Sequence, residues 1–144
     1  MIKNAYLKKY QDFVDFTTSQ QSKDTRYFKD TVDLIREHRL PPERIITAAM
    51  GLSSESGEFA EIIKKIVFQG KPIEEETKFH LKRELGDILW YVCQACIALD
   101  TDLEDIIEMN INKLEDRYPG GFSEFNSNNR KEGDLWKNIC NHLV

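Results

Sequence analysis

The sequence predicts an all-α protein, and three observations support this. Apolar side chains recur at three- and four-residue spacing through long segments, as they do on one face of a helix. No segment shows the alternation of apolar and polar residues that marks a half-buried strand. All four prolines fall at the boundaries of the periodic segments. We therefore expect a helical bundle with three principal helices, N-terminal helices before them and a C-terminal tail after them.

Two helices are expected before the first pair of prolines. Residues 5–17 and residues 26–38 each carry aromatic and aliphatic side chains at helical spacing, with charged residues between them. Pro41 and Pro42 then interrupt the chain, because the residue before a proline avoids the helical region. The N-terminal part is therefore separate from the principal helices that follow.

The three principal helices are each bounded by residues that start or end helices. They are expected from Pro42 or Glu43 to Phe68, from about Glu74 to Leu99, and from Leu103 to Tyr118. Residues 122–133 are rich in asparagine, serine and glycine, which is typical of a loop. A short helix is expected over residues 134–142 at the end of the chain.

Length and charge restrict the class of protein. The 144 residues suit a single domain spanning residues 1–144, and 40% of them are hydrophobic and 31% charged. The net charge is -5, and acidic residues exceed basic ones after residue 44. A protein that binds nucleic acid generally shows a basic face, so we expect no nucleic-acid partner.

The sequence also predicts a cytoplasmic protein that does not enter a membrane. The longest uncharged run, Ile88–Leu99, is too short to span a bilayer, and the start shows no secretory signal. Three cysteines do not suggest a disulfide framework. Cys93 and Cys96 have the spacing of a redox or zinc motif, but they lie in an apolar helical run and are expected in the core.

Two pairs of carboxylates are the strongest candidates for chemistry. On a helical wheel, Glu55 and Glu58 border the apolar stripe of one principal helix, and Glu84 and Asp87 border that of the next. If these helices pack antiparallel, four carboxylates converge, and protons or cations are then needed to offset their repulsion. Oxygen ligands suit Mg²⁺ or Mn²⁺. The spacing alone leaves two interpretations open, a metal site and a solvated face.

The third principal helix places Asn110, Lys113 and Arg117 along one edge of its apolar stripe. Lysine and arginine beside a metal–carboxylate cluster suit a polyphosphate, because lysine supplies a point charge and arginine two parallel hydrogen bonds. Taken without the carboxylates, Lys113 and Arg117 are explained more simply as surface residues paired with neighbouring glutamates.

At these positions the sequence resembles the MazG-type nucleotide pyrophosphohydrolases, which belong to the all-α NTP pyrophosphatases. Their signature is ExxE followed by ExxD on the next helix. The segments that carry the resemblance are GLSSESGE at residues 51–58, KK at 64–65, ELGDILWY at 84–91 and NINKL at 110–114. FNSNNR at residues 125–130 resembles the short Asn-Arg element of compact, single-domain phage and bacterial members. The resemblance covers about residues 45–130.

The resemblance implies a Mg²⁺-dependent enzyme, with Mn²⁺ as a substitute, that hydrolyses an NTP or dNTP to the monophosphate and pyrophosphate. All four carboxylates would hold metal, and Glu55 or Glu58, with Glu55 the first choice, would help to deprotonate the attacking water. The implied substrate-binding residues are Lys65, Tyr91, Asn110, Lys113, Arg117 and Arg130. A homodimer or homotetramer is also implied. The rival interpretation is a non-catalytic helical interaction module with a degenerate acidic site.

Two further features lie beside the acidic pairs. Trp90 falls away from the main apolar stripe, so it either packs on another helix or subunit or stacks on a base, and packing is favoured. Gly51, Gly57 and Gly86 lie inside predicted helices, where each costs ~1 kcal/mol relative to alanine. We interpret these glycines as points of close helix packing.

Overall fold

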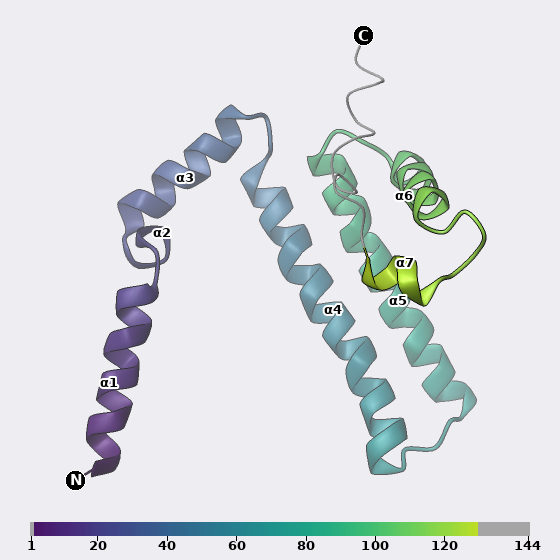
Figure 1. The fold of residues 1–144 in the computed structure, drawn as a ribbon, viewed down its shortest axis with the longest axis horizontal. Coiled ribbons are helices and arrows are strands. Elements are labelled where there is room, and N and C mark those ends of the chain that lie inside the picture. The colour runs from purple at the N-terminus through teal and green to yellow at the C-terminus, as the bar shows by residue number, and fades with distance from the viewer. Residues whose placement is uncertain (1, 130–144) are drawn as a thin grey trace. The chain divides into compact units, whose positions relative to one another are not determined.

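Helices form nearly all the regular structure of the protein, which is known from a computed structural model (Figure 1). The structure describes residues 2–129, and within that range it contains no β-strand. The all-α prediction is therefore confirmed. The chain divides into two compact units, the first ending at Ala98 and the second beginning at Leu99, and each is described by itself.

The first unit contains the two predicted N-terminal helices and the first two principal helices. Its elements are α1 (Ile2–Thr17), α2 (Gln20–Lys23), α3 (Thr25–Glu37), α4 (Pro42–Gln69) and α5 (Glu75–Ala98). The short α2 was not predicted, because a single turn carries no periodic signal. Asp24 ends α2 and caps α3, where its carboxylate accepts a hydrogen bond from the backbone N–H of Arg26 at 2.8 Å.

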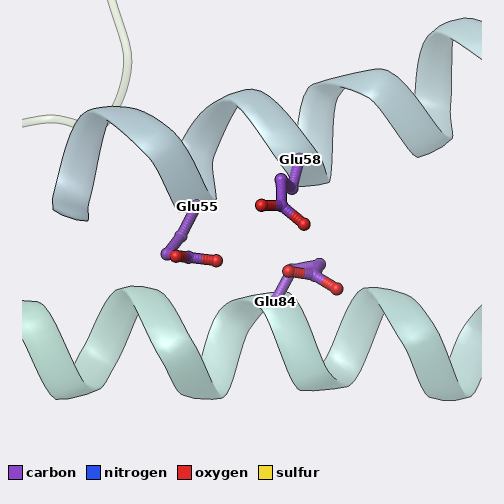
Figure 2. A group of neighbouring side chains, drawn as sticks. All are labelled: Glu55, Glu58 and Glu84. Atoms are coloured by element: carbon purple, nitrogen blue, oxygen red, sulfur yellow. The ribbon is translucent and has the colours of Figure 1, made fainter.

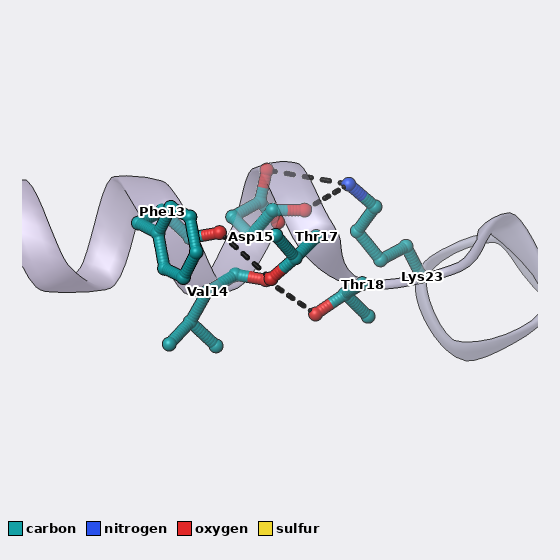
Figure 3. Close-up of polar contacts among 6 residues, drawn as sticks. All are labelled: Phe13, Val14, Asp15, Thr17, Thr18 and Lys23. Atoms are coloured by element: carbon teal, nitrogen blue, oxygen red, sulfur yellow. Dashed lines mark hydrogen bonds and ion pairs between the residues drawn. The ribbon is translucent and has the colours of Figure 1, made fainter.

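Side chains satisfy the last carbonyl groups of α1, which would otherwise lack partners (Figure 3). The hydroxyl of Thr18 donates to the carbonyl oxygen of Val14 at 2.6 Å. Lys23 of α2 donates from Nζ to the carbonyl oxygen of Asp15 at 2.5 Å and pairs with the carboxylate of the same residue at 3.4 Å. These contacts explain why α1 ends at Thr17 and why the chain turns directly into α2.

The end of α4 follows from the glycine that comes after it. Gly70 has φ 69°, in the left-handed region that suits glycine. The backbone N–H of Lys71 then donates to the carbonyl oxygen of Lys65 at 3.1 Å and closes the helix. The connection from α4 to α5 is short, so α5 runs back antiparallel to α4, and the two helices lie side by side (Figure 1).

Small residues allow α4 and α5 to approach closely. Ala48 and Gly51 are buried on α4, and a Cβ atom at Gly51 would overlap the ring of Tyr91 on α5. The predicted close packing is therefore confirmed at Gly51. The prediction is wrong for Gly57 and Gly86, because a Cβ atom there would meet nothing within 4 Å among the described residues.

The second unit contains α6 (Leu103–Arg117) and α7 (Glu124–Asn128). Asp102 caps α6 by accepting a hydrogen bond from the backbone N–H of Asp105 at 2.9 Å. The helix α7 corrects the expectation of a loop from residue 122 onward. Its start is fixed by Ser123, whose hydroxyl accepts a hydrogen bond from the backbone N–H of Asn126 at 3.2 Å. The helix predicted over residues 134–142 lies outside the described residues.

Large apolar side chains remain exposed in the first unit. Phe16 on α1 is 85% exposed, and Met50 and Phe68 on α4 are 70% and 81% exposed. Cys96 is buried, as the core assignment of the cysteines predicts, whereas Cys93 is only half-buried. Within the described residues, no helix combines the length and the apolar character needed to cross a membrane.

Candidate metal centre

Helices α4 and α5 bring three carboxylates together (Figure 2). Glu55 and Glu58 share a face of α4 because they are three residues apart, and α5 carries Glu84 past them. One carboxylate oxygen of each residue lies within 4.8 Å of the others. Three of the four carboxylates singled out from the sequence therefore lie together. They come from two helices that pack antiparallel, which is the arrangement expected to bring them together.

The three carboxylates differ in exposure. Glu84 is only 8% exposed, Glu55 is half-buried and Glu58 is exposed. Among the described residues of the first unit, no lysine or arginine forms an ion pair with any of them. The lysines on α4, Lys64 and Lys65, pair with Glu61 instead. Within the described part of the first unit, the negative charge of the group is therefore not paired with a lysine or an arginine.

The charges in the group act on one another. Burial, followed by repulsion from Glu58, Asp87 and Glu84, raises the pKa of Glu55 above its ordinary value. Asp87 lies outside the group of three, but its negative charge contributes to the raised pKa of Glu55. A bound cation would relieve the repulsion that raises this pKa.

The donor set fits a hard divalent cation. All the candidate ligand atoms are carboxylate oxygens, which suit Mg²⁺ and Mn²⁺, whereas zinc sites generally include histidine or cysteine. Within residues 2–129, no histidine or cysteine joins the three glutamates. The residues present are therefore suited to magnesium or manganese.

The other predicted site residues are placed as follows. Tyr91 packs its ring on Gly51, next to the carboxylates on both helices. Lys65 is exposed and pairs with Glu61 at 3.4 Å. Asn110, Lys113 and Arg117 lie on α6 and belong to the second unit, and Arg130 lies outside the described residues.

A polar contact between α4 and α5 was missed from the sequence. Arg44 donates from Nη1 to Oε1 of Gln94 at 2.7 Å, and this hydrogen bond is partly buried. The spacing on α5 could have indicated Gln94, because this residue follows Asp87 by seven residues and therefore lies on the same edge of the helix. The partner on α4 could not be inferred without the register of the two helices.

A shallow groove surrounds this contact. It has a volume of about 420 Å³, and it is lined by Pro41, Glu43, Arg44, Thr47, Trp90 and Gln94. The indole of Trp90 is 54% exposed and meets the ring of Tyr91 edge to face at a centroid distance of 4.8 Å. The packing role favoured for Trp90 is therefore only partly fulfilled within the first unit.

Comparisons with known proteins point to one family. Residues 44–122 match the family model described as MazG nucleotide pyrophosphohydrolase domain. The chain is 37% identical to the Gene 37 protein of Mycobacterium phage L5 over 89 residues, which are 61% of this chain and 78% of that protein. No solved structure matches the chain. The family match includes all three glutamates of the group as well as Asp87.

Proposed function

The chain belongs to the MazG nucleotide pyrophosphohydrolase family, and we propose on that premise that it hydrolyses nucleoside or deoxynucleoside triphosphates to the monophosphate and pyrophosphate, with Mg²⁺ as the cofactor. The observation that carries this proposal is the meeting of Glu55, Glu58 and Glu84 across α4 and α5. Their mutual repulsion supports a cation at this position, and a cation is what a triphosphate needs in order to approach carboxylates.

Glu55, Glu58, Glu84 and Asp87 would hold the metal. When bound, a divalent cation neutralises charge on the phosphate oxygens and lowers the pKa of a water. Glu55 would accept the proton of the attacking water. Glu58 is the alternative proton acceptor. The water oxygen forms a bond to the α-phosphorus, and pyrophosphate leaves with the electron pair of the broken P–O bond.

The remaining roles rest on the sequence resemblance. Lys65, Lys113 and Arg117 would bind phosphate oxygens, Asn110 would hydrogen-bond the sugar or a phosphate, and Tyr91 and Arg130 would contact the substrate. In the structure Lys65 is held by Glu61, so it would have to exchange this partner for a phosphate. The family match runs through both units, which supports a single domain, and the exposed apolar residues of α4 support a homodimer or homotetramer.

The test is the release of pyrophosphate from a panel of NTPs and dNTPs, with and without Mg²⁺. We expect release only with the cation, and we expect Glu58→Gln and Asp87→Asn each to lower turnover about 100-fold or more, equivalent to roughly 2.7 kcal/mol or more in the barrier. Each substitution preserves shape and removes a negative charge, so circular dichroism should show an intact fold.

Glu74→Gln is the matched control, because it removes the same charge from an exposed position just before α5. It should leave turnover unchanged. If no nucleotide of the panel releases pyrophosphate with Mg²⁺ or Mn²⁺, the rival interpretation, a non-catalytic helical module with a degenerate acidic site, takes the place of this proposal.

A further inference from the structure

We propose that the groove lined by Arg44, Trp90 and Gln94 binds the base of the nucleotide, and that it favours bases presenting a carbonyl oxygen over bases presenting an amino group. This inference rests on the proposed function, because it assumes that a nucleotide occupies the neighbouring metal centre. It assigns roles to Arg44 and Gln94, which are not among the substrate-binding residues that the sequence resemblance implies.

The groove continues the face that carries the carboxylates. On α4, Arg44 and Thr47 fall within an arc of about 80° that also contains Glu55 and Glu58, at 100° per residue. On α5, Trp90 and Gln94 lie three and seven residues after Asp87, within an arc of about 60°.

The separation between groove and carboxylates suits one nucleotide. At a rise of 1.5 Å per residue, Gln94 lies about 10 Å beyond Asp87 along α5, and Thr47 about 12 Å from Glu55 along α4. On α4, Gly51 lies between Thr47 and Glu55, and it contacts the ring of Tyr91 on α5. A phosphate chain at the carboxylates would therefore direct the sugar past Tyr91 and the base toward the groove.

Trp90 supplies a surface on which a base can stack. Its indole is 54% exposed, and it is supported by the edge-to-face contact with Tyr91. Stacking on an aromatic side chain accepts every base, because every base has a π-face. Selection among bases must therefore come from the hydrogen-bonding groups of the groove.

The hydrogen bond between Arg44 and Gln94 determines which hydrogen-bonding groups of the groove remain available to a ligand. A guanidinium can only donate, so the amide atom of Gln94 that faces Arg44 at 2.7 Å must be the oxygen Oε1. The Nε2 amino group of Gln94 then keeps its N–H donors for a ligand. Arg44 itself has no acceptor.

The other polar residues of the groove are already engaged with protein. Glu43 pairs with Arg36 of α3 at 2.7 Å, and the pKa of Glu43 is lowered, first by a hydrogen bond from its own backbone and then by Arg36. The hydroxyl of Thr47 donates to the carbonyl oxygen of Glu43 at 2.7 Å. The N–H groups of Gln94 and the remaining N–H groups of Arg44 are therefore the donors that the groove can offer to a ligand. Uracil, thymine and guanine present a carbonyl oxygen where cytosine and adenine present an amino group.

The experiment measures binding of nucleoside monophosphates without turnover. The chain has two tryptophans, so Trp136→Phe leaves Trp90 as the only one, and its fluorescence reports a base that stacks on it. We expect quenching by UMP and CMP, with UMP bound about tenfold more tightly, because the two bases differ at the group that would face the donors. For the same reason, GMP should bind more tightly than AMP.

Gln94→Glu reverses the chemistry of the groove with little change in size, because a carboxylate keeps the acceptor for Arg44 and loses the N–H donors. In this variant the preference for UMP over CMP should disappear. Gln69→Glu, which adds the same charge at an exposed position on α4, should keep the wild-type ratio.

Three results would overturn the inference: equal affinity for UMP and CMP in the protein with native Gln94, an unchanged ratio in Gln94→Glu, or no quenching of Trp90 by any nucleotide. The first and third require no variant at position 94, so a fold defect in Gln94→Glu does not weaken the test. Pyrophosphate release without base selectivity would refute this inference alone. Base-selective binding without pyrophosphate release would refute the proposed function alone.

Discussion

Glu55 shows how strongly a single carboxylate depends on its surroundings. It is half-buried and faces the charges of Glu58, Asp87 and Glu84, and burial followed by these charges raises its pKa. In the unfolded chain the carboxyl titrates near its ordinary value of 4.5. Because the folded-state pKa is higher, the folded protein binds this proton more tightly. The corresponding contribution to stability is therefore present at acid pH and is lost as the pH rises through the raised pKa.

We therefore predict that Glu55→Gln stabilises the protein in the absence of metal, in a pH-dependent manner. The gain in Tm over the wild type should be small well below pH 4.5, where this carboxyl is mostly protonated in both the folded and the unfolded protein, and should grow as the pH rises toward neutrality. Thermal unfolding followed by circular dichroism in a chelator, at a series of pH values, measures this difference. Addition of Mg²⁺ should reduce or reverse it, because a cation that binds the folded state alone stabilises it, by about 2.7 kcal/mol at a hundredfold excess over Kd.

Glu61→Gln is the control of opposite sign. Its pKa is lowered, chiefly by the hydrogen bond from Lys64, so ionised Glu61 stabilises the fold. This substitution should lower Tm at neutral pH, and the loss should shrink as the pH falls through the lowered pKa. If the curves for wild type and Glu55→Gln run parallel across the pH range, the group does not carry the repulsion described here.

At the scale of the helices, the existence and order of the long helices can be predicted from the sequence, whereas the short helices cannot. The four long helices of the first unit and α6 follow from periodicity, and the end of α4 follows from Gly70. The turns α2 and α7 were missed because each depends on one or two polar contacts, such as Ser123 capping α7. A contact of this kind leaves no periodic pattern in the sequence.

Part of the candidate site could likewise be predicted from the sequence, and part could not. The helical wheel placed Glu55, Glu58 and Glu84 at the edge of the core, because that position depends only on helical geometry. The contact between Arg44 and Gln94 joins residues fifty apart, and it depends on the register in which the two helices pack. No spacing within either helix encodes that register.

Gly51 tests the packing of α4 on α5. A Cβ atom at this position would overlap the ring of Tyr91, so Gly51→Ala should destabilise the protein by about 1–3 kcal/mol from overpacking, less the ~1 kcal/mol that alanine gains as a helix former. Gly57→Ala meets open space on the same helix and should be stabilising by up to ~1 kcal/mol.

The comparison uses urea unfolding of wild type and both variants, with the midpoint and slope recorded separately. Gly51→Ala should also lower turnover, because displaced Tyr91 would shift α5, which carries Glu84, relative to α4. If Gly51→Ala is as stable as Gly57→Ala, the two helices do not approach at this point as closely as the structure has them.

At the scale of the whole molecule, the family match and the exposed surface give different information. The match begins at residue 44, so α1, α2 and α3 precede it. Exposed aromatic residues occur both on α1, as at Phe16, and within the matched region, as at Phe68. Large apolar side chains that are exposed in one chain are typical of an interface between chains where they gather in a patch.

We predict that light scattering gives a mass about two or four times the 16.9 kDa of one chain. Phe68→Glu should weaken this assembly, since burial of one phenylalanine contributes roughly 1.5–3 kcal/mol and a symmetric interface contains the residue twice. The dissociation constant should rise by about 100-fold to 10,000-fold. Gln69→Glu adds the same charge at the next residue without removing apolar surface, so it should leave the mass unchanged.

A mass of one chain at every concentration of the wild type would contradict assembly. Equal weakening by the two variants would show that charge at the end of α4, and not the apolar contact of Phe68, controls it.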